Sequence, residues 1–176
     1  MEKDGRMGFS DAFECFPELE TERLILREII LDDASNLLAL YSDPMVVQYL
    51  DWDGITQEDE ARMMISLYGQ QYRQSRSIRW AIADKAGNSL IGTFLLTDFF
   101  AQKVASIGYD LAQEKWRKGF LTESLDVLLP CFHNELNLER IQAFVHPENH
   151  ASCKMMDRIG FEQEGLLRKE IGRAHV

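Results

Sequence analysis

Residues 106–123 read SIGYDLAQEKWRKGFLTE, and this stretch decides how the rest of the chain is arranged. Ile107, Tyr109 and Leu111 alternate with smaller or polar residues, which is typical of a strand. A polar and basic segment follows. After Gly119, apolar residues recur at helical spacing, at Leu125, Leu128, Leu129, Phe132 and Leu136. The stretch therefore predicts a strand, a basic loop with a glycine, and the start of a helix.

A loop of this kind has the features of a phosphate site. The first turn of a helix has unpaired N–H groups and a partial positive charge, so an anion is stabilised there. Gly119 lets the main chain approach the anion, Thr122 adds a hydroxyl, and Arg117 and Lys118 add positive charge. Many strand–helix turns contain one glycine, however, so an ordinary loop is the alternative, and the flanking elements decide between the two.

The size and composition indicate one ordinary globular domain. The chain has 176 residues, of which 45% are hydrophobic and 27% charged. Nineteen Lys and Arg against 29 Asp and Glu give a net charge of −10. This charge disfavours nonspecific binding of nucleic acid and suits a cationic partner such as an amine or a basic protein.

The compartment is expected to be the cytoplasm, with no membrane contact. No apolar run approaches the roughly 20 residues that span a bilayer, and residues 1–16 lack the apolar core of a signal peptide. Cys15, Cys131 and Cys153 form no pair at metal-ligand spacing, so no metal is expected, and their odd number indicates a reducing compartment.

The periodic segments predict the order β-α-α-α-β-β-β-α-β-α-β. Residues 1–20 have no sustained period and are expected to form a loose arm, and residues 21–176 a single domain. The predicted strands cover 23–30, 78–83, 90–97, 104–111, 140–146 and 161–171. The predicted helices follow Asp32 and Asp33, cover 45–50, run from Thr56 and Asp59 to about 75, begin at Gly119, and run from Asn149 to Ile159 before Gly160.

This order predicts an α/β (α+β) fold with a mixed, mostly antiparallel sheet and helices on both faces. The strands at 78–111 are joined by short turns and must be antiparallel, whereas the strand at 140–146 follows a helical crossover and must be parallel to its neighbour. Parallel strands that separate after the glycine loop leave a V-shaped slot, where a ligand is expected.

Four segments carry a resemblance to a known family. They are ETERLILRE (20–28), IGYDL with EKWRKGFLTES (107–124), RIQAFVHPENHAS (140–152) and DRIGFEQEGLLR (157–168). With these segments in this order, the chain resembles the GNAT superfamily of acyl-CoA-dependent N-acyltransferases. It is most similar to the branch that contains the ribosomal-protein N-terminal acetyltransferases, and the resemblance spans residues 20 to about 170.

The resemblance implies acetyl-CoA as co-substrate in the V-shaped slot. The pyrophosphate is expected on main-chain N–H groups of residues 117–121 and on the Thr122 hydroxyl, and the pantetheine arm beside residues 109–111, like an extra strand. The implied cofactor contacts are Tyr109, Asp110, Leu111, Trp116, Arg117, Lys118, Gly119, Phe120, Leu121, Thr122, Asn149 and Ser152.

The implied reaction is direct attack of a neutral amine on the thioester. A base must remove a proton from the ammonium group, and an acid can protonate the departing thiolate. Ser152 in the pattern Asn149-x-x-Ser152 is expected to be that acid, with Asn149 beside it. The acceptor is expected to be a small-molecule amine or a basic protein N-terminus. Trp52 either lines the acceptor pocket or packs within its loop.

Three positions depart from the family pattern. Trp116 stands where the phosphate motif often begins with Gln or Arg, and Ser106 stands where a Glu often acts as base. The base is therefore unassigned, with Glu28, Asp51 and Asp53 as nearby carboxylates. Only residues 172–176 follow the last predicted strand, so the usual final strand is missing. The gap is expected to be closed by a shift of strand 161–171, by residues 1–20 or by a second chain, and we favour a homodimer.

Two other functions compete with this one. Cys153 lies at a helix start with His150 three residues before it and Asn149 and His146 close by, which favours a thiol acyltransferase or hydrolase. We favour the alternative in which Cys153 is a small packed residue and the histidines are surface polar groups, because no third orienting group is evident. A non-catalytic acyl-CoA-binding protein is the second competitor, and turnover of acetyl-CoA with amines distinguishes it from an enzyme.

Overall fold

The computed structural model describes residues 9–167 of the chain. In chain order the elements are the 3-10 helix η1 (Asp11–Phe13), β1 (Leu19–Glu20), β2 (Leu24–Glu28), η2 (Leu31–Asp33), α1 (Ala34–Tyr41), α2 (Pro44–Val47), α3 (Glu58–Arg73), β3 (Ser77–Asp84), β4 (Ser89–Phe100), β5 (Val104–Leu111), η3 (Gln113–Lys115), α4 (Phe120–Asn134), β6 (Arg140–Ala143) and α5 (His150–Arg158).

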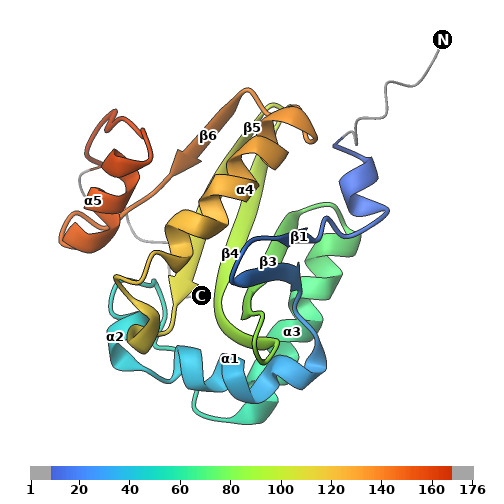
Figure 1. Cartoon of the computed structure of the whole chain (residues 1–176), viewed down its shortest axis with the longest axis vertical. Helices are drawn as coiled ribbons and strands as arrows, with labels where there is room; N and C mark the ends of the chain where they lie inside the picture. Colours follow the sequence, from blue (N-terminus) through green and yellow to red (C-terminus); the bar gives the residue numbers. More distant parts are fainter. Residues whose placement is uncertain (1–8, 168–176) are drawn as a thin grey trace.

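The six strands form one sheet in which spatial order follows chain order, from β1 to β6. Every neighbouring pair is antiparallel except β5 and β6, which run parallel over Val104–Ile107 and Arg140–Ala143. Figure 1 shows α4 crossing the face of the sheet and leading to β6, whose ribbon diverges from β5. The predicted mixed, mostly antiparallel sheet with helices and a parallel pair is confirmed.

Each face of the sheet has its own hydrophobic core. On one face, residues from β2–β5 such as Trp80 and Phe94 pack against Leu125, Leu128 and Phe132 of α4. On the other face, α1 and α3 pack over the sheet through residues including Leu37, Leu40, Tyr41, Ala61 and Ile65. β3 is buried along almost its whole length because it is covered on both faces. Residues 109 and 110, which are adjacent on β5, consequently face different helical layers.

The segment before β2 packs onto the sheet, although its sequence suggested a loose arm. Ala12 is fully buried, and Phe9, Phe13 and Phe16 pack against the core of the α4 face. The Tyr72 hydroxyl donates to the Ala12 carbonyl (2.8 Å), and the Trp80 indole N–H donates to the Pro17 carbonyl (2.6 Å). Aromatic anchors without regular spacing hold residues 9–20, which explains why no period was visible.

Several predicted boundaries move. α2 covers Pro44–Val47 rather than 45–50, and β4 covers Ser89–Phe100 rather than 90–97. β2 covers Leu24–Glu28 rather than 23–30. α3 begins at Glu58, and its capping acid is Glu60 rather than Asp59, since the Glu60 carboxylate accepts hydrogen bonds from the backbone N–H groups of Thr56 (2.8 Å) and Gln57 (2.9 Å). A carboxylate at this position satisfies N–H groups that the helix leaves unpaired.

The strand predicted at 161–171 does not form in its described part. Residues 161–167 have no strand pairing, and 162–167 are exposed. Glu164 is instead held by an ion pair with Arg140 of β6 (2.5 Å), which is a side-chain contact and not a ladder. β6 itself ends at Ala143 instead of continuing to 146, so it offers a short pairing edge. Residues 168–171 of the predicted strand lie outside the described residues.

Within residues 9–167, each helix is too short or too polar to cross a bilayer.

Candidate active site

The slot begins where β6 stops pairing with β5. Pairing ends at Ile107 and Ala143, so β5 has an open edge from Gly108 onward. The N–H of Ala112 donates to Ile91 and thus points toward β4. Backbone groups alternate in direction along an antiparallel strand, so the N–H and C=O groups of Tyr109 and Leu111 point to the open edge. These are groups with which an extended ligand can pair.

Trp116 already forms a hydrogen bond with one of those backbone groups. Its indole N–H donates to the Leu111 carbonyl (2.7 Å), and its side chain remains 36% exposed. Among the described residues, the N–H and C=O of Tyr109 and the N–H of Leu111 are then the groups at this edge that have no partner. This hydrogen bond ties the loop that follows β5 to the last residue of the strand.

The loop that follows presents a helix start without a side-chain cap. Gly119 is the N-cap of α4 and has a φ of +80°, a left-handed conformation that L side chains rarely adopt. The first helical bond runs from the N–H of Glu123 to the Gly119 carbonyl (2.9 Å). No side chain of the described part of the chain caps the N-terminus, so the N–H groups of residues 120–122 remain available to an anion. Arg117 and Lys118 are exposed beside them.

A side-chain clasp from the first part of the chain holds this loop. Arg23 donates from Nε to Glu123 (2.7 Å) and from NH1 to the Lys118 carbonyl (3.1 Å), and its guanidinium lies 4.3 Å from the centre of the Phe120 ring. Glu123 also accepts from the Thr21 hydroxyl. Partial burial opposes ionisation, but the hydrogen bonds from Thr21 and Arg23 lower the pKa of Glu123. No local sequence pattern predicts this clasp, because its partners are about 100 residues apart.

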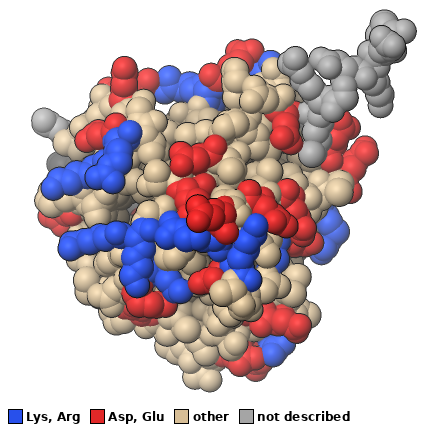
Figure 2. All heavy atoms as spheres, in the orientation of Figure 1, with Lys and Arg blue, Asp and Glu red and all other residues tan. Residues whose placement is uncertain are grey.

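The basic side chains of this acidic protein gather around the same loop. Figure 2 shows Lys and Arg side chains in a band over the region of the η3–α4 loop and α5, next to an acidic group. The loop supplies Lys115, Arg117 and Lys118, and α5 supplies Lys154 and Arg158. Local positive charge at a helix start favours a phosphate group despite the net charge of −10.

The predicted pair Asn149 and Ser152 lies at the start of α5. The Asn149 side chain caps the helix by accepting from the Ser152 N–H (3.1 Å). The Ser152 hydroxyl is in a short hydrogen bond with the Tyr109 hydroxyl of β5. Burial raises the pKa of Tyr109 to about 12, so its hydroxyl is protonated at neutral pH. Two hydroxyl groups thus join the open edge of β5 to the first turn of α5.

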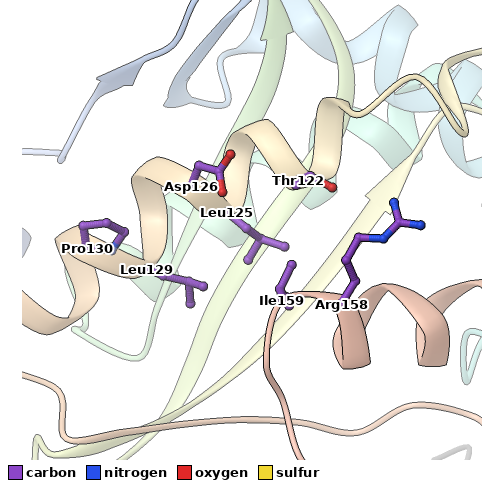
Figure 3. Close-up of a pocket in the computed structure, with 7 residues that line it drawn as sticks. All are labelled: Thr122, Leu125, Asp126, Leu129, Pro130, Arg158 and Ile159. Carbon is purple, nitrogen blue, oxygen red and sulfur yellow. The ribbon is translucent and has the colours of Figure 1, made fainter.

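A cavity of about 350 Å³ lies between α4 and α5. Figure 3 shows Arg158 and Ile159 at the end of α5 facing Thr122 and Leu125 of α4, with Asp126, Leu129 and Pro130 completing the lining. The cavity contacts Thr122 in the first turn of α4 and therefore adjoins the uncapped helix start.

Aromatic contacts link α1 and the segment after α2 to their neighbours, including the loop before α5. The Trp52 ring meets the Tyr41 ring edge-on, at 5.1 Å between centroids, and packs against the α1–α3 core. Tyr49 stacks on His146 (5.4 Å) and donates to the Glu148 carbonyl (3.2 Å). This contact connects the segment after α2 to the loop between β6 and α5.

The three carboxylates considered as bases, Glu28, Asp51 and Asp53, are exposed. Ser106 is only 4% exposed, and its hydroxyl accepts from the Gln142 side chain of β6 (3.2 Å).

The thiol mechanism receives no geometric support from residues 9–167. Cys153 makes no recorded hydrogen bond with His146 or His150, and the His146 ring accepts from the N–H of Glu148. Nor do three His, Cys, Asp or Glu side chains in this range converge as a metal site requires.

Comparisons with known proteins place this architecture among acetyltransferases. Residues 23–162 match the family model described as an acetyltransferase (GNAT) domain. The uncharacterized N-acetyltransferase YoaA of Bacillus subtilis (strain 168) is 37% identical over 156 residues, which cover 88% of each chain. The [ribosomal protein uS5]-alanine N-acetyltransferase of Escherichia coli (strain K12) is 23% identical over 158 residues, covering 85% of this chain and 80% of that protein.

Among solved structures, the fold matches RimL, a ribosomal L7/L12 alpha-N-protein acetyltransferase in complex with coenzyme A, with a TM-score of 0.79. The two chains are 21% identical, and the match covers 88% of this chain and 89% of RimL.

Proposed function

The chain belongs to the GNAT family and is an acetyl-CoA-dependent acetyltransferase; from this premise we propose that it acetylates a primary amine by direct attack on the thioester. The hydroxyl pair of Tyr109 and Ser152 beside the open edge of β5 is the observation that carries the proposal. It provides a proton donor where a thiolate would leave a cofactor paired with that edge.

The cofactor would be held by the uncapped helix start. The pyrophosphate accepts from N–H groups of residues 119–122 and from the Thr122 hydroxyl, and Arg117 and Lys118 supply positive charge. The pantetheine pairs with the free backbone groups of Tyr109 and Leu111. The cavity beside Thr122 receives the nucleotide end, with Arg158 next to its phosphate.

The departing thiolate would take its proton from Ser152. Tyr109 is protonated at neutral pH and can donate its hydrogen to the Ser152 oxygen, which leaves the serine proton free to point at sulfur. Asn149 fixes the start of α5 and thereby the place of Ser152. Cys153 has no part in this chemistry.

The acceptor would be a small cationic amine or a protein N-terminus. Two proteins similar to this chain are named for acetylating ribosomal proteins, which supports the second class. The net charge of −10 supports a basic acceptor of either kind. Trp52, next to Tyr41 on the acceptor side, is a candidate contact.

The free thiols of Cys15, Cys131 and Cys153 support a reducing, cytoplasmic setting for the reaction. The edge of β6, with exposed Phe144 (62%) nearby, supports pairing with a second copy, which sedimentation over a range of concentrations would test.

The experiment is an acceptor screen that follows thiol release and acetylated product. The panel contains peptides with free N-termini, polyamines and amino sugars, and calorimetry measures coenzyme A binding in parallel. Ser152→Ala should lower kcat by about 10²-fold or more with little change in coenzyme A affinity. Cys153→Ala is the matched control and should remain active.

Binding of coenzyme A without acetylation of any acceptor would support a non-catalytic binding protein instead. Loss of activity in Cys153→Ala, or an acetyl thioester trapped on Cys153, would favour the thiol mechanism.

A further inference from the structure

A cluster of buried and half-buried polar side chains covers β5 on the face opposite Tyr109. Its members come from separate elements of the α1–α3 side of the sheet, and we name them the Asp110 cluster: Tyr41 of α1, Tyr68 of α3, Arg79 of β3, Thr93 of β4 and Asp110 of β5. The resemblance implied Asp110 as a cofactor contact, but the function proposed above uses none of these side chains, so their chemistry needs a separate explanation.

The cluster binds one oxygen of Asp110 and leaves the other free. Oδ2 accepts from the Tyr41 hydroxyl (2.9 Å) and the Thr93 hydroxyl (3.3 Å), and it lies 4.0 Å from the Arg79 guanidinium. Oδ1 has no donor among residues 9–167 and is not a fully buried atom. The side chain of Asp110 is 12% exposed. Asp110 therefore keeps one acceptor oxygen for a group from outside.

A different buried acid of this chain shows what a purely structural ion pair looks like. Asp33 accepts from both terminal nitrogens of Arg27 at 2.8 Å and also from the N–H of Ile30. Both of its oxygens are occupied. Arg79, in contrast, donates to Thr93 (3.0 Å) and Tyr41 (3.3 Å), so it lies near Asp110 without saturating the carboxylate.

The strand geometry places Asp110 beside the slot and leaves room next to it. Asp110 lies in the part of β5 that β6 does not pair with. Gly108, two residues earlier on the same face, has no side chain, and within residues 9–167 a Cβ there would meet only Leu95, at 3.9 Å. An ammonium group can therefore approach Asp110 over Gly108, from the α1–α3 side.

We propose that Asp110 is the catalytic base: its free oxygen binds the ammonium group of the acceptor and takes one proton from it. Tyr41, Thr93 and Arg79 are positioning residues that orient the carboxylate. This assignment rests on the proposed function. It supplies a base for the reaction, since Ser106 stands at the position where the family often has a glutamate.

The two faces of β5 then divide the proton transfers between them. On one face, a proton passes from the ammonium nitrogen to Asp110 Oδ1, and the neutral amine forms a bond to the thioester carbon. On the other face, the C–S bond breaks and the sulfur takes a proton from Ser152, next to Tyr109. The nitrogen loses its second proton to water as the amide forms, Ser152 regains a proton from water, and Asp110 returns its proton to water, so that one proton is released overall.

The charged and titratable groups around Asp110 are compatible with this role. Burial raises the pKa of Asp110, an effect partly opposed by Arg79 and by the hydrogen bonds from Tyr41 and Thr93. Burial also raises the pKa values of Tyr41 and Tyr68, so both phenols are neutral at pH 7. A carboxylate with a raised pKa is a better proton acceptor, and Arg79 still favours its ionised form.

The test compares two nucleophiles that differ in charge. An alkyl amine is protonated at pH 7 and needs a base, whereas hydroxylamine is neutral at that pH and does not. Asp110→Asn should lower kcat for the amine by about 10²–10⁴-fold and should change the enzymatic rate with hydroxylamine by only a few fold. The rise of kcat/KM with pH that reports ionisation of Asp110 should disappear.

Asp33→Asn is the matched control, because it also removes a buried carboxylate beside an arginine. It should lower thermal stability while leaving the pH profile and the ratio of the two rates as in the wild type. Tyr41→Phe removes a hydrogen bond that favours the ionised Asp110, so the acid limb of its profile should move to higher pH. This variant tests the proposal even if Asp110→Asn does not fold.

Equal losses with amine and hydroxylamine in Asp110→Asn, or an unmoved acid limb in Tyr41→Phe, would overturn the assignment. If the wild type binds coenzyme A and acetylates amines, such a result removes only the base and leaves the proposed function standing. Failure of the wild type to acetylate any amine would overturn both.

Discussion

Replacing Gly119 by alanine tests whether the left-handed residue before α4 shapes a phosphate site. An alanine Cβ at this position would lie 3.5 Å from the nearest Arg23 nitrogen, which is ordinary van der Waals contact. The substitution therefore causes no clash, and its cost is that of holding an L residue at a φ of +80°. That cost is about 1–2 kcal/mol.

The loop around Gly119 is exposed, so it can relax in the free protein and must be restored when a phosphate binds. We therefore expect Gly119→Ala to weaken coenzyme A by about 5–30-fold, the equivalent of that strain. Calorimetry with coenzyme A, and denaturant unfolding of the free protein, would measure where the cost appears. Gly119→Asn is the control, because asparagine tolerates the left-handed region better and should lose less affinity.

Unchanged coenzyme A affinity in Gly119→Ala, with unfolding also unchanged, would refute the reasoning, because the strain must appear in one of the two measurements. Equal losses for alanine and asparagine would show that the added side chain, and not the backbone conformation, matters.

Three further perturbations address the clasp, the buried ion pair and the cavity. Glu123 has a lowered pKa, so its contribution to stability is present above about pH 4.5 and is lost as the pH falls through the folded-state pKa. The melting temperature of Glu123→Gln should therefore depend less on pH below about 4 than that of the wild type. Asp33→Ala leaves the buried Arg27 without its carboxylate and should cost about 3–5 kcal/mol in urea unfolding, and a loss below 1 kcal/mol would contradict a strong pair. Arg158→Gln should weaken coenzyme A by at most about 1 kcal/mol and dephospho-coenzyme A less, as measured by calorimetry; equal weakening would remove Arg158 from the terminal phosphate.

Local patterns predicted those parts of the site that are built from neighbouring residues. The alternation at 107–111, Gly119 and the apolar spacing after it correspond to β5, the N-cap and α4. Asn149 caps α5 as expected, because an Asn side chain at the N-cap can accept a hydrogen bond from the unpaired N–H three residues later. Such features depend on backbone geometry within one turn.

Contacts between distant segments were not predictable from any local pattern. The Tyr109–Ser152 hydroxyl pair and the Arg23–Glu123 clasp join residues 43 and 100 positions apart. Residues 9–20 have no period because three isolated phenylalanines, rather than a face of a helix or strand, hold them against the core.

The segment at 161–167 is a case in which a predicted strand does not form. A strand was predicted here, but a strand is stable only when its N–H and C=O groups find a partner. β6 is paired for four residues and ends at Ala143, and the side chain of Glu164 meets Arg140 without forming a ladder. Residues 161–167 therefore form no strand, because no neighbouring strand pairs with them.

The sequence by itself determined the order of the elements, the parallel crossover and the glycine at the start of α4, because periodicity, capping and φ preferences act within a few residues. Only the tertiary structure decided which side chains share a site. Asp110 and Tyr109 are adjacent in the chain, yet the pleat of β5 turns one toward Tyr41 and Arg79 and the other toward Ser152. Their partners come from α1, β3 and α5, and packing of those elements against the two faces of the sheet is what brings them together.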